Sequence, residues 1–215
     1  MIFEFLKKNT SSRLTLLFAG WGMSASDFRF LENNSSDLLI CSDYRQFSFD
    51  SEVLSPYTDI RLVAYSLGVW AAAFVFRESN IPFSEKIAIN GTHYPVDNER
   101  GIPISIYEGT ERQLTERSLR KFHFRMCGSK AGGERFVSQT VPKNISNLKE
   151  ELRTIQKMSA LHAVSDFRWG KVIMSANDNI FPIENQRNAW KNYERTEEMD
   201  APHFSEELFR VLHSH

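Results

Sequence analysis

Residues 61–70, Arg61-Leu62-Val63-Ala64-Tyr65-Ser66-Leu67-Gly68-Val69-Trp70, run from an apolar strand through a Ser-x-Gly turn into an alanine-rich helix. A serine on a tight strand-to-helix turn is typical of the α/β-hydrolase nucleophile, whose neighbours two residues away must be small. Ala64 and Gly68 meet that requirement. A lone Ser-x-Gly also fits an ordinary strand-turn-helix connection, so the rest of the chain has to decide between the two interpretations.

Two later segments supply an acid and a base in the chain order Ser, acid, His of this fold. Residues 170–178 form an apolar strand that ends on a polar turn, which makes Asp178 the predicted acid. His203 lies on a loop before an amphipathic final helix and is the predicted general base. Alone, Asp178 also suits a turn and His203 a protein surface. His93, which follows another strand, is the second candidate for the base.

A tetrahedral oxyanion needs hydrogen-bond donors as well as a nucleophile and a base. The backbone N–H of Leu67, directly after the serine, is one predicted donor. The second is the N–H of Trp21, which stands between Gly20 and Gly22 after an early apolar strand. The alternative is that the two glycines only mark a strand-to-helix turn.

Apolar runs and helical patterns alternate along most of the chain. Strands are predicted at 13–18, 37–42, 60–65, 85–89 and 171–175. Helices are predicted near 24–33, 67–79 and 183–195. Such alternation predicts an α/β fold, a mainly parallel sheet with helices on both faces, and a site beyond the carboxyl ends of the strands.

Residues from about 110 to 165 interrupt this alternation, are strongly charged and look helical, which predicts a helical cap insertion within one domain spanning 1–215. One helix there has two stripes. The apolar stripe consists of Leu119, Phe122 and Met126. The basic stripe consists of Arg117, Lys121 and Arg125. The stripe fits either a solvated amphipathic helix or a landing site for an acidic partner or a phosphate.

Composition narrows the function classes. The 215 residues are 41% hydrophobic, enough for one core, and no linker divides them. A net charge of −1 gives no bias towards nucleic acid or an anionic membrane. We expect neither a secretion signal nor a membrane span, since no window approaches about 18 apolar residues. Two cysteines without ligand spacing give little support for a metal site or disulfides, so we expect a protein of the reducing cytoplasm. The sequence leaves the oligomeric state open.

Several segments spread over nearly the whole chain carry a family resemblance. They are residues 18–23, 64–70, 89–92, 101–103, 121–122, 125–127 and 177–182. Together they resemble the BioG-type pimeloyl-[acyl-carrier-protein] methyl ester esterases of biotin synthesis. The resemblance implies an α/β-hydrolase fold and a triad of Ser66, His203 and Asp178, with the Trp21 and Leu67 amides as oxyanion donors.

The same resemblance implies a serine carboxylesterase that needs no cofactor and cleaves the methyl ester of pimeloyl-acyl-carrier protein through an acyl-enzyme. The residues that would line the acyl channel, or alternatively belong to the core, are Gly20, Trp21, Tyr65 and Phe122. The residues that would dock the acidic carrier protein are Arg112, Arg117, Arg120, Lys121 and Arg125. Two alternatives stay open: a general short-chain carboxylesterase or thioesterase, and a non-catalytic module that binds acyl-carrier protein or another ligand on a hydrolase scaffold.

Overall fold

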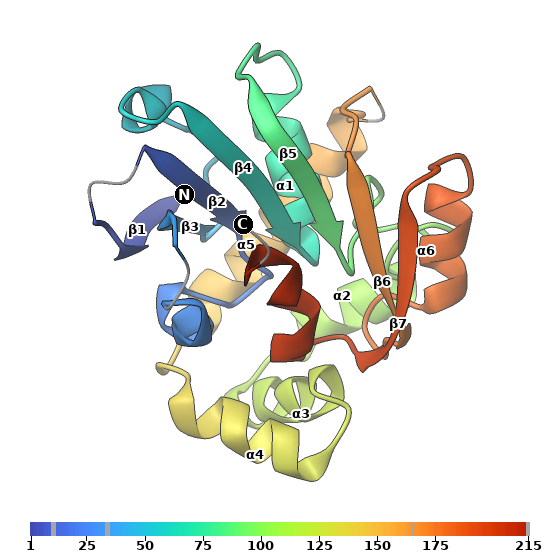
Figure 1. The fold of residues 1–215 in the computed structure, drawn as a ribbon. Coiled ribbons are helices and arrows are strands. Elements are labelled where there is room, and N and C mark those ends of the chain that lie inside the picture. The colour runs from blue at the N-terminus through green and yellow to red at the C-terminus, as the bar shows by residue number, and fades with distance from the viewer. Residues whose placement is uncertain (10–11, 33–34, 165, 214–215) are drawn as a thin grey trace.

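A computed structural model describes residues 1–9, 12–32, 35–164 and 166–213. In this part of the chain seven strands form one sheet in the order β1-β3-β2-β4-β5-β6-β7 (Figure 1). The strands are β1 (Ile2–Lys7), β2 (Arg13–Phe18), β3 (Asp37–Ser42), β4 (Asp59–Tyr65), β5 (Phe83–Ile89), β6 (Lys171–Asn177) and β7 (Thr196–Pro202). All neighbouring pairs are parallel except β1 with β3, which confirms the predicted mainly parallel sheet.

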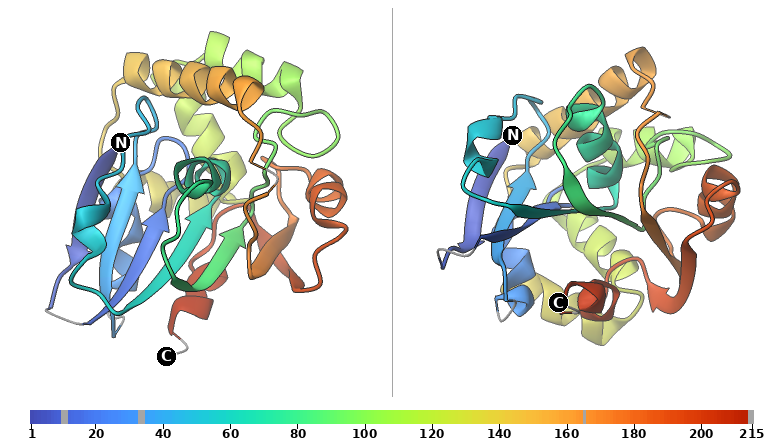
Figure 2. Two further views of the ribbon diagram at one scale, coloured as in Figure 1. Left: turned by 90° about the horizontal axis from the view of Figure 1, so that it is seen from above. Right: turned by 45° about the horizontal axis from the view of Figure 1, so that its top comes forward.

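Helices cover both faces of the sheet, as predicted. On one face α1 (Leu67–Phe76) lies between the sheet and α5 (Ile145–Leu161), as Figure 2 shows. Almost every residue of α1 is buried, which suits a helix covered on all sides. On the other face, η1 (Ala25–Leu31) meets η3 (Glu206–His213), where the rings of Phe28 and Phe209 are 5.6 Å apart.

Four helices stand between β5 and β6 and form what we call the insertion, residues 104–161. They are α2 (Ile104–Arg112), α3 (Glu116–Met126), α4 (Lys130–Gln139) and α5. The helices start earlier than residue 110, since α2 begins at Ile104, directly after its N-cap residue Pro103. Residue 165, the predicted end, lies outside the described residues. Figure 1 shows α3 and α4 beyond the carboxyl ends of the strands, so the insertion faces the edge where a site is expected.

The remaining elements are η2 (Ser51–Leu54) and α6 (Ile183–Trp190). The predicted helix at 24–33 and the final helix are 3₁₀ segments, and η1 is kinked at Phe28, whose φ of −114° is non-helical. Residue 33 lies outside the described part. Among the helices of the described ranges, none is long and apolar enough to cross a membrane.

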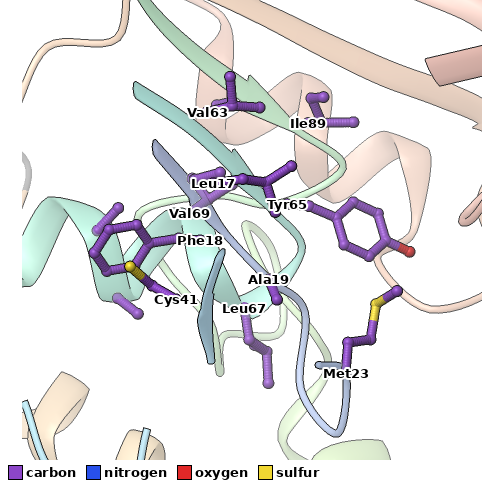
Figure 3. Packing of buried hydrophobic residues seen from close by; sticks show 14 of the residues in the cluster. Leu17, Phe18, Ala19, Met23, Cys41, Val63, Tyr65, Leu67, Val69 and Ile89 are labelled. Atoms are coloured by element: carbon purple, nitrogen blue, oxygen red, sulfur yellow. The ribbon is translucent and has the colours of Figure 1, made fainter. Parts of the chain in front are cut away.

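The core ties the strand ends to the helices around them. Phe18, paired in register with Cys41, packs edge-on against Phe76 of α1 with ring centroids 5.7 Å apart. Tyr65 contacts Phe209 of η3 on the opposite face, at 5.5 Å. Figure 3 shows Phe18 and Cys41 on one side of the strands and Tyr65 on the other. The carboxyl ends of β2 and β4 are therefore held from both faces.

Candidate active site

Ser66 occupies a strained turn between β4 and α1. Its backbone has φ 58° and ψ −129°, a conformation that residues other than glycine rarely adopt. Two glycines make room for the turn. A Cβ at Gly68 would lie 2.4 Å from the Ala19 carbonyl oxygen, and a Cβ at Gly91 would lie 2.1 Å from the Ser66 carbonyl oxygen. The backbone thus crowds around Ser66, as a nucleophile elbow requires.

His203 joins Ser66 to Asp178. Its Nε2 lies 3.0 Å from Ser66 Oγ, and its Nδ1 lies 2.7 Å from Asp178 Oδ2. All three residues are buried. The structure brings together the three residues that the sequence analysis singled out, although they lie on three separate segments of the chain.

The surroundings of Asp178 fix the direction of this chain of hydrogen bonds. Its Oδ1 accepts from the backbone N–H of Ile180 at 2.7 Å and of Phe181 at 2.8 Å. Its Oδ2 also accepts from Gln186 Nε2 at 3.0 Å. Since a carboxylate only accepts, Nδ1 of neutral His203 carries the proton and Nε2 is free to take one from the Ser66 hydroxyl.

Asn90 holds the backbone of His203, and the sequence analysis did not predict this. Its Nδ2 donates to the His203 carbonyl oxygen and to Ser175 Oγ, both at 2.7 Å, and its Oδ1 accepts from the Ser175 N–H at 2.7 Å. Tyr65 donates a further hydrogen bond to the His203 carbonyl oxygen at 3.1 Å. The usable signal was the Asn-Gly pair at the end of β5, because asparagine tolerates the positive φ of 47° found there.

A largely apolar pocket opens at Ser66. Its lining includes Gly20, Trp21, Tyr65 and Phe122, the four residues that were expected to line an acyl channel. The insertion contributes Ile106, Tyr107, Thr110, Arg125, Met126 and Leu152 as well as Phe122. Trp21 and Phe122 meet edge to face with ring centroids 5.1 Å apart. The sheet edge and the insertion therefore form the pocket together.

The two predicted oxyanion donors lie on backbone that borders Ser66. Leu67 follows it as the first residue of α1. Trp21 lies in a turn closed by a hydrogen bond of 3.2 Å from the Met23 N–H to the Gly20 carbonyl oxygen. Gly22 has φ 71° there, as a type II turn requires. A Cβ at Gly20 would lie 3.2 Å from Ser66 Cβ, so this turn packs directly against the serine.

The five basic residues expected to dock a carrier protein are exposed, and within the described ranges none of them forms an ion pair. Lys121 and Arg125 line a groove between α2 and α3. Ile106, Thr110, Phe122 and Arg125 line both this groove and the pocket at Ser66. The groove therefore adjoins the pocket and leads from it towards the basic face of α3.

His93, the second candidate for the base, lies elsewhere. Its ring packs against Trp190 at 4.9 Å and Tyr193 at 6.4 Å. Burial lowers the pKa of His93 to about 4. It belongs to the packing around the end of α6, and His203 holds the position beside Ser66.

The two thiols and the possible metal ligands stand apart from this arrangement. Cys41 and Cys127 are free and buried, and burial raises the pKa of Cys127 to about 11. Across the described residues, no group of three or more His, Cys, Asp or Glu side chains is placed to hold a metal ion. The chemistry that the Ser66, His203 and Asp178 side chains offer is transfer of the Ser66 proton to an oriented imidazole.

Comparison with known proteins finds relatives by sequence and by structure. The chain is 43% identical over 196 residues to a malonyl-[acyl-carrier protein] O-methyltransferase of Bacteroides fragilis, covering 91% of this chain. It spans 40% of the length of that relative. The crystal structure of BioG from Haemophilus influenzae has a TM-score of 0.89 at 33% identity, covering 100% of this chain and 98% of that one.

More distant structures show the same fold. A hydrolase from Oleispira antarctica has a TM-score of 0.66 at 11% identity, covering 99% of this chain and 94% of that one. With the parallel sheet, this confirms the expected α/β-hydrolase fold. The model of the family described as pimeloyl-ACP methyl esterase BioG matches residues 1–214, which confirms the expected esterase class. The chain belongs to the BioG family of pimeloyl-ACP methyl esterases.

Proposed function

We propose that this protein hydrolyses the methyl ester of pimeloyl-acyl-carrier protein in biotin synthesis, with Ser66, His203 and Asp178 as its catalytic triad. The carrying observation is the hydrogen-bonded chain from Ser66 Oγ through His203 to Asp178, at 3.0 and 2.7 Å, beneath an apolar pocket. Membership of the BioG family supplies the substrate. The strained backbone of Ser66 also favours an enzyme over a binding module, because strain of this kind clusters at catalytic sites.

The first half-reaction forms an acyl-enzyme. Ser66 Oγ attacks the carbonyl carbon of the methyl ester while its proton passes to His203 Nε2. The backbone N–H groups of Leu67 and Trp21 stabilise the oxyanion of the tetrahedral intermediate. The intermediate collapses, the bond from carbon to methoxy oxygen breaks, and His203 protonates the oxygen so that methanol leaves.

The second half-reaction releases the acid. A water molecule gives a proton to His203 Nε2 and attacks the carbonyl carbon of the acyl-enzyme. Collapse of this second intermediate breaks the bond to Ser66 Oγ, which regains its proton from His203. The products are free Ser66 and a pimeloyl group with a carboxylate at its far end. No cofactor takes part in this scheme.

The surroundings of the triad suit a long chain tethered to an acidic protein. The apolar lining, with Ile102, Leu152 and Ile180, matches the methylene groups of a dicarboxylic ester. The groove beside Lys121 and Arg125 offers the tether a route towards the basic face of α3. We place carrier docking on that face, on Arg112, Arg117, Arg120, Lys121 and Arg125, since unpaired surface cations attract an acidic partner.

The name of one relative points to a partner reaction. The longer Bacteroides relative is named as a methyltransferase acting on an oxygen of malonyl-acyl-carrier protein. Transfer of a methyl group to a carboxylate oxygen makes a methyl ester, which is the group that the proposed esterase removes. In this proposal residues 104–161 act as a cap on a single hydrolase domain, and the enzyme works in the cytoplasm.

Substrate selection tests the proposal. The kcat/KM of the purified protein should be measured on pimeloyl-acyl-carrier protein methyl ester and on a p-nitrophenyl ester of a short acid. We expect a clear preference for the carrier-bound ester, with methanol released and the thioester left intact. Cleavage of the small ester alone would instead identify a general carboxylesterase. Cleavage of the thioester would identify a thioesterase.

A further inference from the structure

Glu151 is a buried carboxylate that the proposed chemistry does not use. It lies on α5 of the insertion with 3% of its surface exposed. Leu148, Leu152 and Ile155 are buried on the same helix, so Glu151 interrupts an otherwise apolar face. A buried charge is costly unless hydrogen bonds compensate it, so the partners of this carboxylate should matter to the structure.

The hydrogen-bond partner of Glu151 is Tyr44, which also contacts residues 19–23, the segment that carries Trp21 and that we call the oxyanion loop. The Tyr44 N–H donates to Glu151 Oε1 at 3.1 Å. The Gly22 N–H lies near enough to lower the pKa of this carboxyl group, as the Tyr44 N–H does, against the larger effect of burial, which raises that pKa to about 7. Gly22 directly follows Trp21 and packs against α5, since a Cβ at Gly22 would lie 3.3 Å from Leu148 Cδ2, so the helix that carries Glu151 adjoins the proposed oxyanion donor.

The same network reaches the other side of Trp21. Tyr44, whose amide donates to Glu151, donates its own hydroxyl to the Ala19 carbonyl oxygen at 2.7 Å. The Trp21 indole Nε1 donates to the Leu148 carbonyl oxygen of α5 at 3.0 Å. The turn from Gly20 to Met23 is therefore hydrogen-bonded to α5 at Trp21, and Ala19, which precedes the turn, is linked to Glu151 through Tyr44.

We infer that Glu151 is a positioning residue for catalysis, which holds the Trp21 amide at the place where the oxyanion forms. This inference rests on the proposed function, in which Trp21 is an oxyanion donor. It makes α5 part of the catalytic framework, so that the insertion does more than receive the carrier protein. Oxyanion donors act because they are aligned before the reaction, and loss of alignment lowers kcat more than substrate binding.

The test replaces Glu151 by Leu and by Gln, and the neighbouring Glu150 by Leu as a matched control. The Glu150 side chain is 61% exposed and lies on the same helix. Steady-state kinetics should use the small p-nitrophenyl ester, so that carrier docking plays no part. A trifluoromethyl ketone, which forms a tetrahedral adduct on an active serine, should serve as the oxyanion probe.

Glu151→Leu should lower kcat about tenfold or more while KM stays within about twofold, by comparison with removal of an oxyanion donor. Affinity for the ketone should fall by the same factor as kcat/KM. Glu151→Gln, which keeps one acceptor at the same reach, should retain more activity, and Glu150→Leu should behave as the wild type. A folded Glu151→Leu with wild-type kcat and ketone affinity would overturn the inference, as would a fall in kcat without weaker ketone binding.

A second comparison applies where Glu151→Leu does not fold. Glu151→Asp keeps the charge but withdraws the carboxylate by one methylene group, so the inference requires a lower kcat for Asp than for Gln. Equal kcat values would contradict it. Ser66→Ala separates a failure of the proposed function from a failure of this inference. Ester turnover that survives in Ser66→Ala overturns the proposed triad. Turnover that depends on Ser66 but not on Glu151 overturns this inference alone.

Discussion

The carboxyl edge of the sheet and the insertion contribute differently to the pocket. At the edge, Ser66, Asp178 and His203 are buried, close together and held by short hydrogen bonds to rigid strands and their turns. The insertion supplies apolar lining on one side and, on α2 and α3, exposed basic residues for which the described part of the chain offers no ion pair. From this difference we propose a division of labour, in which the edge performs ester hydrolysis and the insertion selects the substrate.

The largest expected effect comes from replacing Asp178 at the carboxyl edge of the sheet. In Asp178→Asn the side-chain amide would donate to His203 Nδ1 and force the proton onto Nε2, so the imidazole could no longer take the Ser66 proton. By comparison with the same change in a serine protease, kcat should fall about 10⁴-fold. The loss should be equal on the carrier-bound and the small ester, because both use the same chemistry.

Asp200→Asn provides the matched control, since Asp200 is exposed and accepts from Asn177 instead of from the histidine. It should keep wild-type kcat on both esters. Circular dichroism of both variants establishes that they are folded. An Asp178→Asn protein that is folded and retains near wild-type turnover would remove Asp178 from the mechanism.

A second prediction concerns Glu151, where the edge and the insertion meet. Burial raises its pKa from the ordinary 4.5 to about 7; Asp43 also raises it, and Arg45 and the two amides lower it. Burial raises the pKa of the Tyr107 phenol of α2, and the nearby Glu151 raises it further. Because the folded protein binds the Glu151 proton more tightly, this contribution to stability is complete below pH 4.5 and is lost as the pH rises through 7.

Glu151→Gln cannot titrate at this position. The free energy of unfolding of the variant, minus that of the wild type, should therefore rise by about 3 kcal/mol between pH 4.5 and pH 8. Urea denaturation across this range measures the difference. A difference for Glu151→Gln that stays constant with pH would mean that Glu151 has an ordinary pKa in the folded protein.

The smallest effect is expected from the basic face of the insertion. Arg117→Glu combined with Lys121→Glu should raise KM for the carrier-bound ester about tenfold, because like charges would then repel an acidic partner. The small ester should be turned over as by the wild type. Lys157→Glu, a single reversal on α5, should affect neither substrate. Equal losses on both esters would show that the double change damages the pocket, against the proposed division.

The edge was easier to predict from the sequence than the insertion, for physical reasons. Ser66, Asp178 and His203 each follow a local signal, such as a small-residue turn or a polar end to an apolar strand, and the fold dictates their order. β7 was missed because its sequence, TEEMDAP, has no apolar run; it forms by backbone pairing with β6, and only Ala201 is buried. β1 was missed because its first residues are exposed on an edge strand.

Contacts between segments that are distant in the chain could not be predicted from the sequence. Asn90 and Glu151 contact partners far along the chain, namely the His203 carbonyl oxygen for the first and the Tyr44 N–H for the second. A glutamate within the apolar stripe of Leu148, Leu152 and Ile155 was a visible anomaly, but the sequence does not say what satisfies it. The helical character of residues from about 110 to 165 was predicted, whereas the start of α2 at Ile104 and the meeting of α5 with the oxyanion loop needed the structure.

The most direct test of the account is the rate of methanol release from pimeloyl-acyl-carrier protein methyl ester, measured for the wild type and for Ser66→Ala at equal concentrations of folded protein. Alanine fits the turn as well as serine does, so the fold should persist. The account predicts steady release by the wild type and a loss of at least about 10³-fold in Ser66→Ala. Comparable release by the two proteins would contradict the central role of Ser66.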